Sequence, residues 1–292
     1  MQKHQYDRAA EDVGNIVGLG HVNTAIPDQR LATLFYVSGL GLTRDPFLNT
    51  STDNMWINVG QSQFHLPTGG PEILRGITGL VLPDRAALLE RLERIRGPLQ
   101  GTCFAFRESN DGVETLSPWS NRINCHAPDP HRFGPVVLGM AYVLFDVRPG
   151  TAARIARFYR EILQAPATDL IDDERGRRIR VMVGARQYLV FRESDETERS
   201  FDGHHVQIDV ADFSGPHRRL MALGLVTEES DAHQYRFKDI VDLDTRQVLF
   251  TIEHEVRSMQ HPMYARPLVN RDPAQTAMNY RPGRDNMAWS ME

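Results

Sequence analysis

Histidine is the residue type in this chain with the widest chemical capacity, and three positions stand out. His21 lies at the start of an apolar strand, His65 interrupts the run Gln63-Phe64-His65-Leu66, and His205 belongs to a His-His pair that opens another strand. An imidazole can bind a metal ion or transfer a proton near neutral pH. A lone histidine at a strand start is most often structural, but a buried imidazole within an apolar run needs a polar partner. These three histidines are therefore candidates for a shared site.

The composition argues against several other kinds of chemistry. The chain has 292 residues, of which 41% are hydrophobic and 24% are charged, and its formal net charge is −5. These are ordinary values for a globular protein of one large or two medium domains. The absence of a Lys/Arg run predicts neither a nucleic acid nor a membrane as a partner. Cys103 and Cys125 form no Cys-x-x-Cys pair and the N-terminal residues are polar, which predicts a cytoplasmic protein with two reduced cysteines in its core.

The elements that must position the histidines follow an internal repeat. Four stretches share an apolar strand followed by a helix-starting break, and their equivalent residues are His21, Ile77, Met140 and His205, with separations of 56, 63 and 65 residues. This near-constant spacing predicts four copies of one unit. Each strand is followed by apolar residues at helical spacing and then by β-like stretches broken by turn residues. Each unit is therefore predicted to be βαβββ.

Differences between the copies predict how they are organised. The predicted helices of units one and three share a Phe-Tyr pair, Phe35-Tyr36 and Phe158-Tyr159, whereas those of units two and four are shorter. This alternation predicts a duplicated pair, with a first domain over 17–127 and a second over 136–256, each of two units. Residues 257–292 lose the periodicity and contain several prolines, so they are predicted to be an extended C-terminal arm or a tail.

The repeat resembles the vicinal oxygen chelate superfamily, which includes glyoxalase I, the extradiol dioxygenases and the bleomycin-resistance proteins. Three segments carry the resemblance: Gly20-His21-Val22 leading to Pro27-Asp28, Phe35-Tyr36 followed by Leu40-Gly41, and Ser117-Pro118-Trp119-Ser120-Asn121-Arg122-Ile123. The resemblance implies an α+β fold in which four βαβββ modules form paired, cup-shaped mixed sheets. It also implies a divalent metal held by up to four side chains, which come from the first and the last strand of each paired unit.

The candidate metal ligands follow from this resemblance position by position. Unit one offers His21 and His65, and unit four offers His205 with either Leu249 or Glu253, depending on where a loop in its last hairpin is placed. The two middle units offer Ile77, Asn124, Met140 and Leu189.

The pairing of the units then decides the chemistry. Pairing of units one and four would gather His21, His65, His205 and Glu253 in one cup and leave the other without ligands. Pairing of units one and two would leave a weaker site, with Asn124 and His126 as further ligands. We favour the first pairing, because imidazoles with a carboxylate suit Fe(II), Mn(II), Ni(II) or Zn(II).

The resemblance implies a metal-dependent enzyme that acts on a small oxygen-bearing substrate, in a monomer or homodimer. Fe(II) is the favoured ion. If Glu253 binds the metal, a dioxygenase is favoured; if Glu253 does not bind it, a glyoxalase-like lyase or isomerase fits equally well. By analogy with the extradiol branch, His233 and Tyr235 are candidates for a proton shuttle and a substrate hydrogen-bond donor. The alternative function is a metal-free protein that binds a small molecule, as in the bleomycin-resistance branch.

Overall fold

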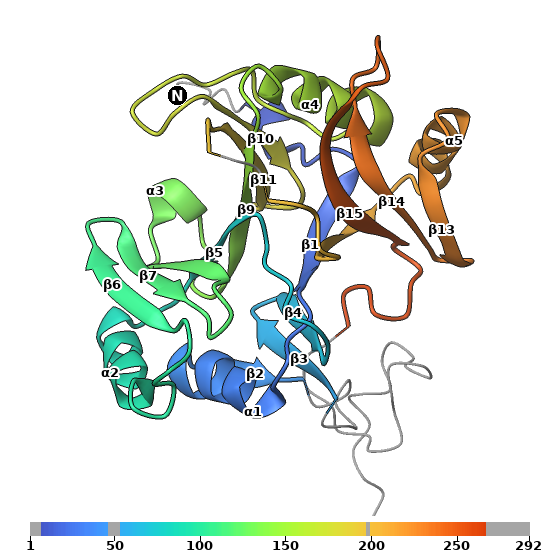
Figure 1. Ribbon diagram of the computed structural model, residues 1–292. Coiled ribbons are helices and arrows are strands. Elements are labelled where there is room, and N and C mark those ends of the chain that lie inside the picture. The colour runs from blue at the N-terminus through green and yellow to red at the C-terminus, as the bar shows by residue number, and fades with distance from the viewer. Residues whose placement is uncertain (1–6, 46–52, 197–198, 267–292) are drawn as a thin grey trace, which may run out of the picture.

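The computed structural model describes residues 7–45, 53–196 and 199–266, which form four successive units (Figure 1). Unit one contains β1 (Ile16–Asn23), α1 (Gln29–Ala32), η2 (Thr33–Gly39), β2 (Thr43–Arg44), β3 (Asn54–Val59) and β4 (Ser62–Pro67). Unit two contains β5 (Gly76–Val81), α2 (Arg85–Ile95), β6 (Ala105–Ser109), β7 (Gly112–Leu116) and β8 (Arg122–His126). A single turn, η1 (Ala9–Glu11), precedes unit one, and α3 (Pro130–Phe133) follows unit two.

Units three and four repeat this order. Unit three contains β9 (Gly139–Val147), α4 (Ala152–Phe158), η3 (Tyr159–Leu163), β10 (Arg178–Met182) and β11 (Tyr188–Glu193). Unit four contains β12 (His205–Val210), α5 (Ser214–Ala222), β13 (Val226–Asp231), β14 (Gln234–Val241) and β15 (Val248–Ser258). Three units have the predicted βαβββ order, whereas in unit three the first strand after the helix is reduced to two isolated bridges, Ala167 with Val181 and Ile171 with Arg178.

The two sheets join units from different halves of the chain. Within the described residues, one sheet has eight strands in the order β13-β14-β15-β12-β1-β4-β3-β2, and the other has seven in the order β10-β11-β9-β5-β8-β7-β6. Units four and one therefore share one sheet, and units three and two share the other. Strands β1 and β12 are antiparallel neighbours at the junction, where Val22 pairs with Val206. The predicted α+β fold and the predicted pairing of units one and four are both confirmed.

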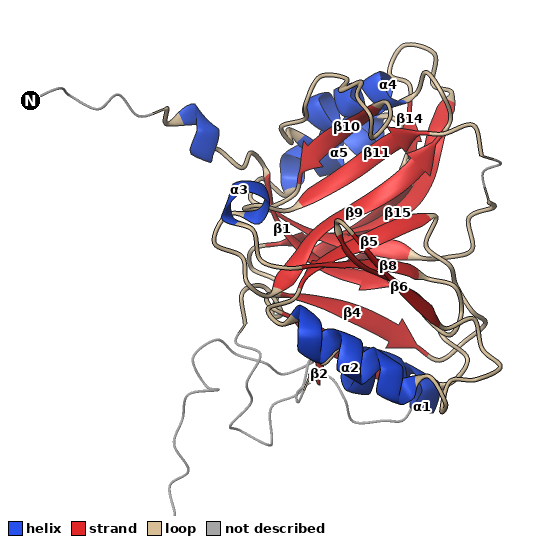
Figure 2. Cartoon of the chain, turned by 90° about the vertical axis from the view of Figure 1, so that its left-hand side faces the viewer, coloured by secondary structure: helices blue, strands red, loops and turns tan. Residues whose placement is uncertain are grey.

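The helices pack within each half of the chain, while the sheets cross between the halves. Helix α2 packs against η2, and α5 packs against η3, so the strands lie between two helical layers (Figure 2). The Phe-Tyr pairs of units one and three lie at matching places, Phe35-Tyr36 in η2 and Phe158-Tyr159 where α4 passes into η3, and all four side chains are buried. The domain limits at 17–127 and 136–256 stay a prediction, because each sheet contains strands from both of these segments.

Two further predictions have definite outcomes. Cys125 is buried as predicted, but Cys103 is exposed, because it lies in the loop between α2 and β6. The predicted arm starts later than residue 257, because β15 continues to Ser258; residues 259–266 follow it, and the rest of the arm lies outside the described residues. In the part of the chain that the structure describes, no helix has the length and apolar character that a membrane crossing requires.

Candidate metal centre

Three strands of the eight-stranded sheet bring the predicted histidines together. His21 lies on β1, His65 on β4 and His205 on β12, and β1 runs between the other two strands. Side chains of a strand alternate between the two faces of its sheet. The three imidazoles contact one another on one face of this sheet, which we call the cup face.

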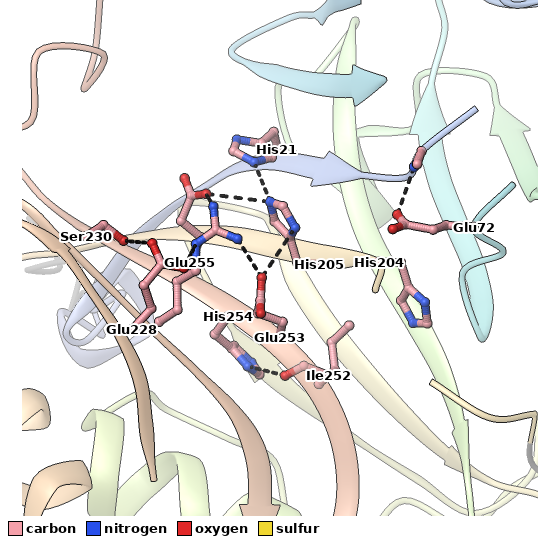
Figure 3. A network of polar contacts seen from close by, with 12 residues as sticks. His21, Glu72, His204, His205, Glu228, Ser230, Ile252, Glu253, His254 and Glu255 are labelled. Carbon is pink, nitrogen blue, oxygen red and sulfur yellow. Dashed lines mark hydrogen bonds and ion pairs between the residues drawn. The ribbon is translucent and has the colours of Figure 1, made fainter. Parts of the chain in front are cut away.

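The three imidazoles form a compact group. Nε2 of His21 lies 3.2 Å from Nε2 of His205 (Figure 3). One ligand atom from each of His21, His65 and His205 lies within 4.8 Å of the other two. Among the described residues, this is the one group of three or more His, Cys, Asp or Glu side chains placed to hold a metal ion.

The environment keeps these histidines neutral. Burial lowers the pKa of His21 and that of His205 well below the ordinary value of 6.5, and the positive charges of nearby arginines add to the effect. Burial, with Arg257 and Arg236 nearby, lowers the pKa of His65 to about 3. A neutral imidazole has a free lone pair on one nitrogen, which is the form that binds a metal.

His65 supplies an independent test of whether a metal fits. Its ring stacks on Trp56, with centroids 3.9 Å apart and planes 14° from parallel. Its Nε2 atom is buried and has no hydrogen-bond partner within the described residues. A buried polar atom without a partner costs free energy. An ion at the centre of the group would give this nitrogen a partner, so the residues present fit a metal.

Two glutamates on β15 border the cluster from opposite sides of one imidazole. Glu253 Oε1 lies 3.7 Å from Nδ1 of His205, whereas Glu255 Oε2 lies 3.6 Å from Nε2 of the same ring. Nε2 is the nitrogen that faces His21. Glu255 is therefore on the side of the histidine cluster, and Glu253 is on the outer side of the ring.

The strand register gives the same assignment. In unit one, β1 and β4 are parallel, and His65 lies two residues beyond the partner of His21. In unit four, β12 and β15 are also parallel, and the residue two beyond the partner of His205 is Glu255. His65 and Glu255 are thus equivalent positions of the two paired units.

Arginines hold both carboxylates. Arg236 pairs with Glu253 Oε1 at 2.6 Å and with Glu255 Oε2 at 2.5 Å, and Arg257 pairs with Glu255 Oε1 at 2.6 Å. The Glu255 side chain is 4% exposed. An ion bound at the cluster would share Glu255 with Arg236.

The structure does not bring the predicted catalytic pair to the cluster. Tyr235 is buried on the helix side of β14, where its ring packs against Phe213 and His217, with centroids 5.0 and 4.9 Å away. The neighbouring Arg236 faces the cup instead, because successive residues of a strand point to opposite faces. His233 lies in the turn between β13 and β14, where its N–H donates a hydrogen bond to Asp231 Oδ1. Neither residue enters the site proposed below.

The alternative ligands His126 and Asn124, in the seven-stranded sheet, have structural roles. His126 on β8 has Asp111 O 2.7 Å from Nδ1 and the Tyr142 hydroxyl 2.9 Å from Nε2. Both of its ring nitrogens therefore have partners. Asn124, on the same strand, also hydrogen-bonds to Tyr142. The seven-stranded sheet brings no cluster of metal-binding side chains together within the described residues.

Sequence reasoning missed Glu255, although a signal was present. The segment Ile252-Glu253-His254-Glu255-Val256 alternates apolar or buried positions with glutamates. In a strand this alternation places both glutamates on one face, so either could reach the cup. What the sequence lacks is the register of β15 against β12, which distinguishes them.

Comparisons with known proteins give the fold a name. No protein-family model matches the chain, and no curated protein matches it in sequence. Among solved structures, it is similar to glyoxalase I from Zea mays, with a TM-score of 0.58 and 13% identity over 82% of this chain and 92% of that one. It is also similar to a "putative dioxygenase" from Bacillus subtilis, with a TM-score of 0.55 and 15% identity over 84% of this chain and 86% of that one. The chain therefore has a glyoxalase/dioxygenase-like fold.

Proposed function

We propose that the protein is a divalent-metal-dependent enzyme that acts on a small oxygen-bearing substrate, through dioxygenase-like or glyoxalase-like chemistry. The observation that carries this proposal is the largely buried, neutral cluster of His21, His65 and His205, in which Nε2 of His65 has no hydrogen-bond partner among the described residues. The similarity of the fold to a glyoxalase I and to a structure titled as a dioxygenase supports this reaction class as an analogy between folds.

Each residue of the site has a distinct task in this proposal. The three histidines would hold the ion, and Glu255 is the carboxylate best placed to complete its ligand set. Glu253 lies beside Nδ1 of His205 and would orient that ring, as carboxylates commonly do for metal-bound histidines. When bound, a divalent ion supplies Lewis acidity for neighbouring substrate oxygens. A set of imidazoles with one carboxylate suits Fe(II), with Mn(II), Ni(II) and Zn(II) as the other candidates.

The test is the metal content of protein purified without chelators. We expect about one equivalent of Fe, Mn, Ni or Zn per chain. A His21→Ala/His65→Ala double variant should lose the ion. Loss of an outer partner of a metal ligand lowers metal affinity by roughly 10- to 100-fold, and each single variant, which loses a ligand itself, should lower the affinity by more than that.

A matched control is His126→Asn, which changes a buried histidine of the other sheet whose nitrogens already have protein partners. This variant should keep the ion. Protein that is metal-free as purified and takes up none of the four ions in titration would contradict the proposed function and favour the metal-free binding protein.

A further inference from the structure

A cavity of about 810 Å³ opens on the cup face beside His21. Its polar floor is formed by residues of three adjacent strands, including Gln63, Gln207 and Asp209. Its other walls are mainly apolar and come from residues 135–138, which precede β9, from the first three residues of β9, and from Met263 to Ala265 of the C-terminal segment. This volume is in the range of sites for small organic molecules. The cavity is therefore large enough for a substrate that extends well beyond the histidine cluster.

Two glycines shape the floor of this cavity. A Cβ atom on Gly20 would lie 1.6 Å from Gln207 Oε1, and one on Gly18 would lie 3.4 Å from Asp209 Oδ2. The side chain of Gln207 thus occupies space that a Cβ atom at position 20 would fill, and the side chain of Asp209 lies over Gly18 at contact distance. Gln207 Nε2 donates a hydrogen bond of 3.0 Å to Asp209 Oδ1, which fixes the direction of the carboxyl group.

The arginines that line the cavity are not in ion-pair contact with Asp209. Of the arginines that line it, Arg257 pairs with Glu255 and Arg266 pairs with Asp45, while Arg186 is exposed at the rim. Asp209 accepts a hydrogen bond from a neutral amide, and no cation of the described residues lies in ion-pair contact with it. A carboxylate that faces a cavity without a cationic partner is suited to a ligand that donates a hydrogen bond.

The register fixes where Asp209 stands relative to the metal centre. Gly18 pairs with Asp209, and His21 pairs with Gln207. Asp209 is therefore two residues further along β12 from the partner of His21, a distance of roughly 7 Å along the strand. A ligand that reaches the histidine cluster at one end would meet Asp209 at its other end.

We propose that Asp209 forms a second binding subsite, which accepts a hydrogen bond from an ammonium or hydroxyl group at the end of the substrate remote from the metal. This inference rests on the proposed function, because the metal anchors the first end. Burial raises the pKa of Asp209 to about 6; Gln207 and Arg257 oppose this shift and Glu255 adds to it. The carboxylate is thus ionised at pH 7 and able to accept a hydrogen bond from such a group.

The experiment uses the full chain loaded with Mn(II) and a series of hydroxamic acids, which chelate through two neighbouring oxygens. The probes carry an ammonium, a hydroxyl, a methyl or a carboxylate group at the far end of alkyl chains of several lengths, and calorimetry gives their affinities. A hydrogen bond to a charged group predicts about 10- to 100-fold tighter binding of the best ammonium probe than of the methyl probe of equal length. The hydroxyl probe should fall between these two, and the carboxylate probe should bind most weakly.

Two variants locate the effect. Asp209→Asn should remove the preference for ammonium and leave the affinity of the methyl probe within about twofold, since the metal contacts are unchanged. Asp169→Asn, which changes a side chain that is 98% exposed and distant in sequence, should behave as the unmodified protein.

The outcomes separate this inference from the function on which it rests. Metal-dependent binding of all four probes with equal affinity, tighter binding of the carboxylate probe, or an ammonium preference that survives in Asp209→Asn would each overturn the subsite and leave the metal centre intact. Failure of the protein to take up any metal, or equal binding of the probes with and without Mn(II), would overturn both.

Discussion

Nε2 of His21 lies 3.2 Å from Nε2 of His205, although 184 positions of the sequence separate the two residues. If these two neutral imidazoles hydrogen-bond to each other, one of the facing nitrogens carries the proton and donates it, and the other accepts it. In the third imidazole, that of His65, the buried Nε2 has no hydrogen-bond partner within the part of the chain that the structure describes. A common ion would satisfy all three, which is the physical basis of the proposed metal centre.

Acidification should destabilise the protein before its carboxylates titrate. The folded state lowers the pKa of His65 and of His254 to about 3, and those of His21 and His205 well below 6.5. The unfolded chain therefore binds more protons as the pH falls below about 6.5, and stability is lost on the acid side. The expected slope is about 1.4 kcal/mol per pH unit for each such histidine. Urea unfolding of the metal-free protein at pH 7, 6 and 5 measures this slope. His65→Asn should give a shallower slope. A free energy of unfolding that is constant from pH 7 to 5 would contradict the prediction.

The two glutamates of β15 should differ in their effect on metal affinity. Glu255 lies on the cluster side of His205 and Glu253 on the Nδ1 side. Glu253→Gln removes an outer partner and should weaken metal binding by about 10- to 100-fold. Glu255→Gln should weaken it further, because it removes the negative charge nearest to the ion. Competition with a chelator of known affinity measures both, and the reverse order would assign the ligand role to Glu253.

Asp209→Asn should make the folded protein more stable at neutral pH. The pKa of Asp209 is raised to about 6 from an ordinary value of 3.8. Folding thus disfavours the ionised carboxylate, a penalty that is absent below about pH 4 and complete above about pH 6. The variant keeps an oxygen that can accept the Gln207 hydrogen bond, so we expect a gain of about 1–3 kcal/mol at pH 7 and none at pH 3.5. Denaturant unfolding at the two pH values checks this, and equal gains at both would refute the electrostatic cause.

Arg266→Ala should detach the C-terminal segment from the cavity. Arg266 pairs with Asp45, and the side chains are 3% and 0% exposed. Breaking a buried ion pair by removing one partner typically costs about 3–5 kcal/mol. Arg107→Ala removes one member of an exposed pair with Glu114 and should have little effect. Unfolding measurements give the free energies, and limited proteolysis between residues 259 and 266 should become faster in Arg266→Ala alone; unchanged proteolysis would show that this pair does not hold the segment.

The sequence alone determined the units and most of the candidate ligands. The period of about 60 residues, with apolar strands followed by helical spacing, depends on local propensities and hydrophobic patterns, which are properties of short segments. His65 and His205 could be named because they interrupt or open apolar stretches. The sequence also places His21 at the start of a strand, whereas β1 begins five residues earlier, at Ile16.

The tertiary structure decided which of these residues meet. Pairing of β1 with β12 joins the first unit to the last, and this depends on contacts between segments nearly 200 residues apart that no local pattern encodes. The register of β15 against β12 placed Glu255, and not Glu253, at the position equivalent to His65, and the alternation of β14 turned Tyr235 towards the helices. A shift of one residue in register reverses which side chains face a cup. Register and sheet order, which only the folded chain fixes, therefore determine the composition of the site.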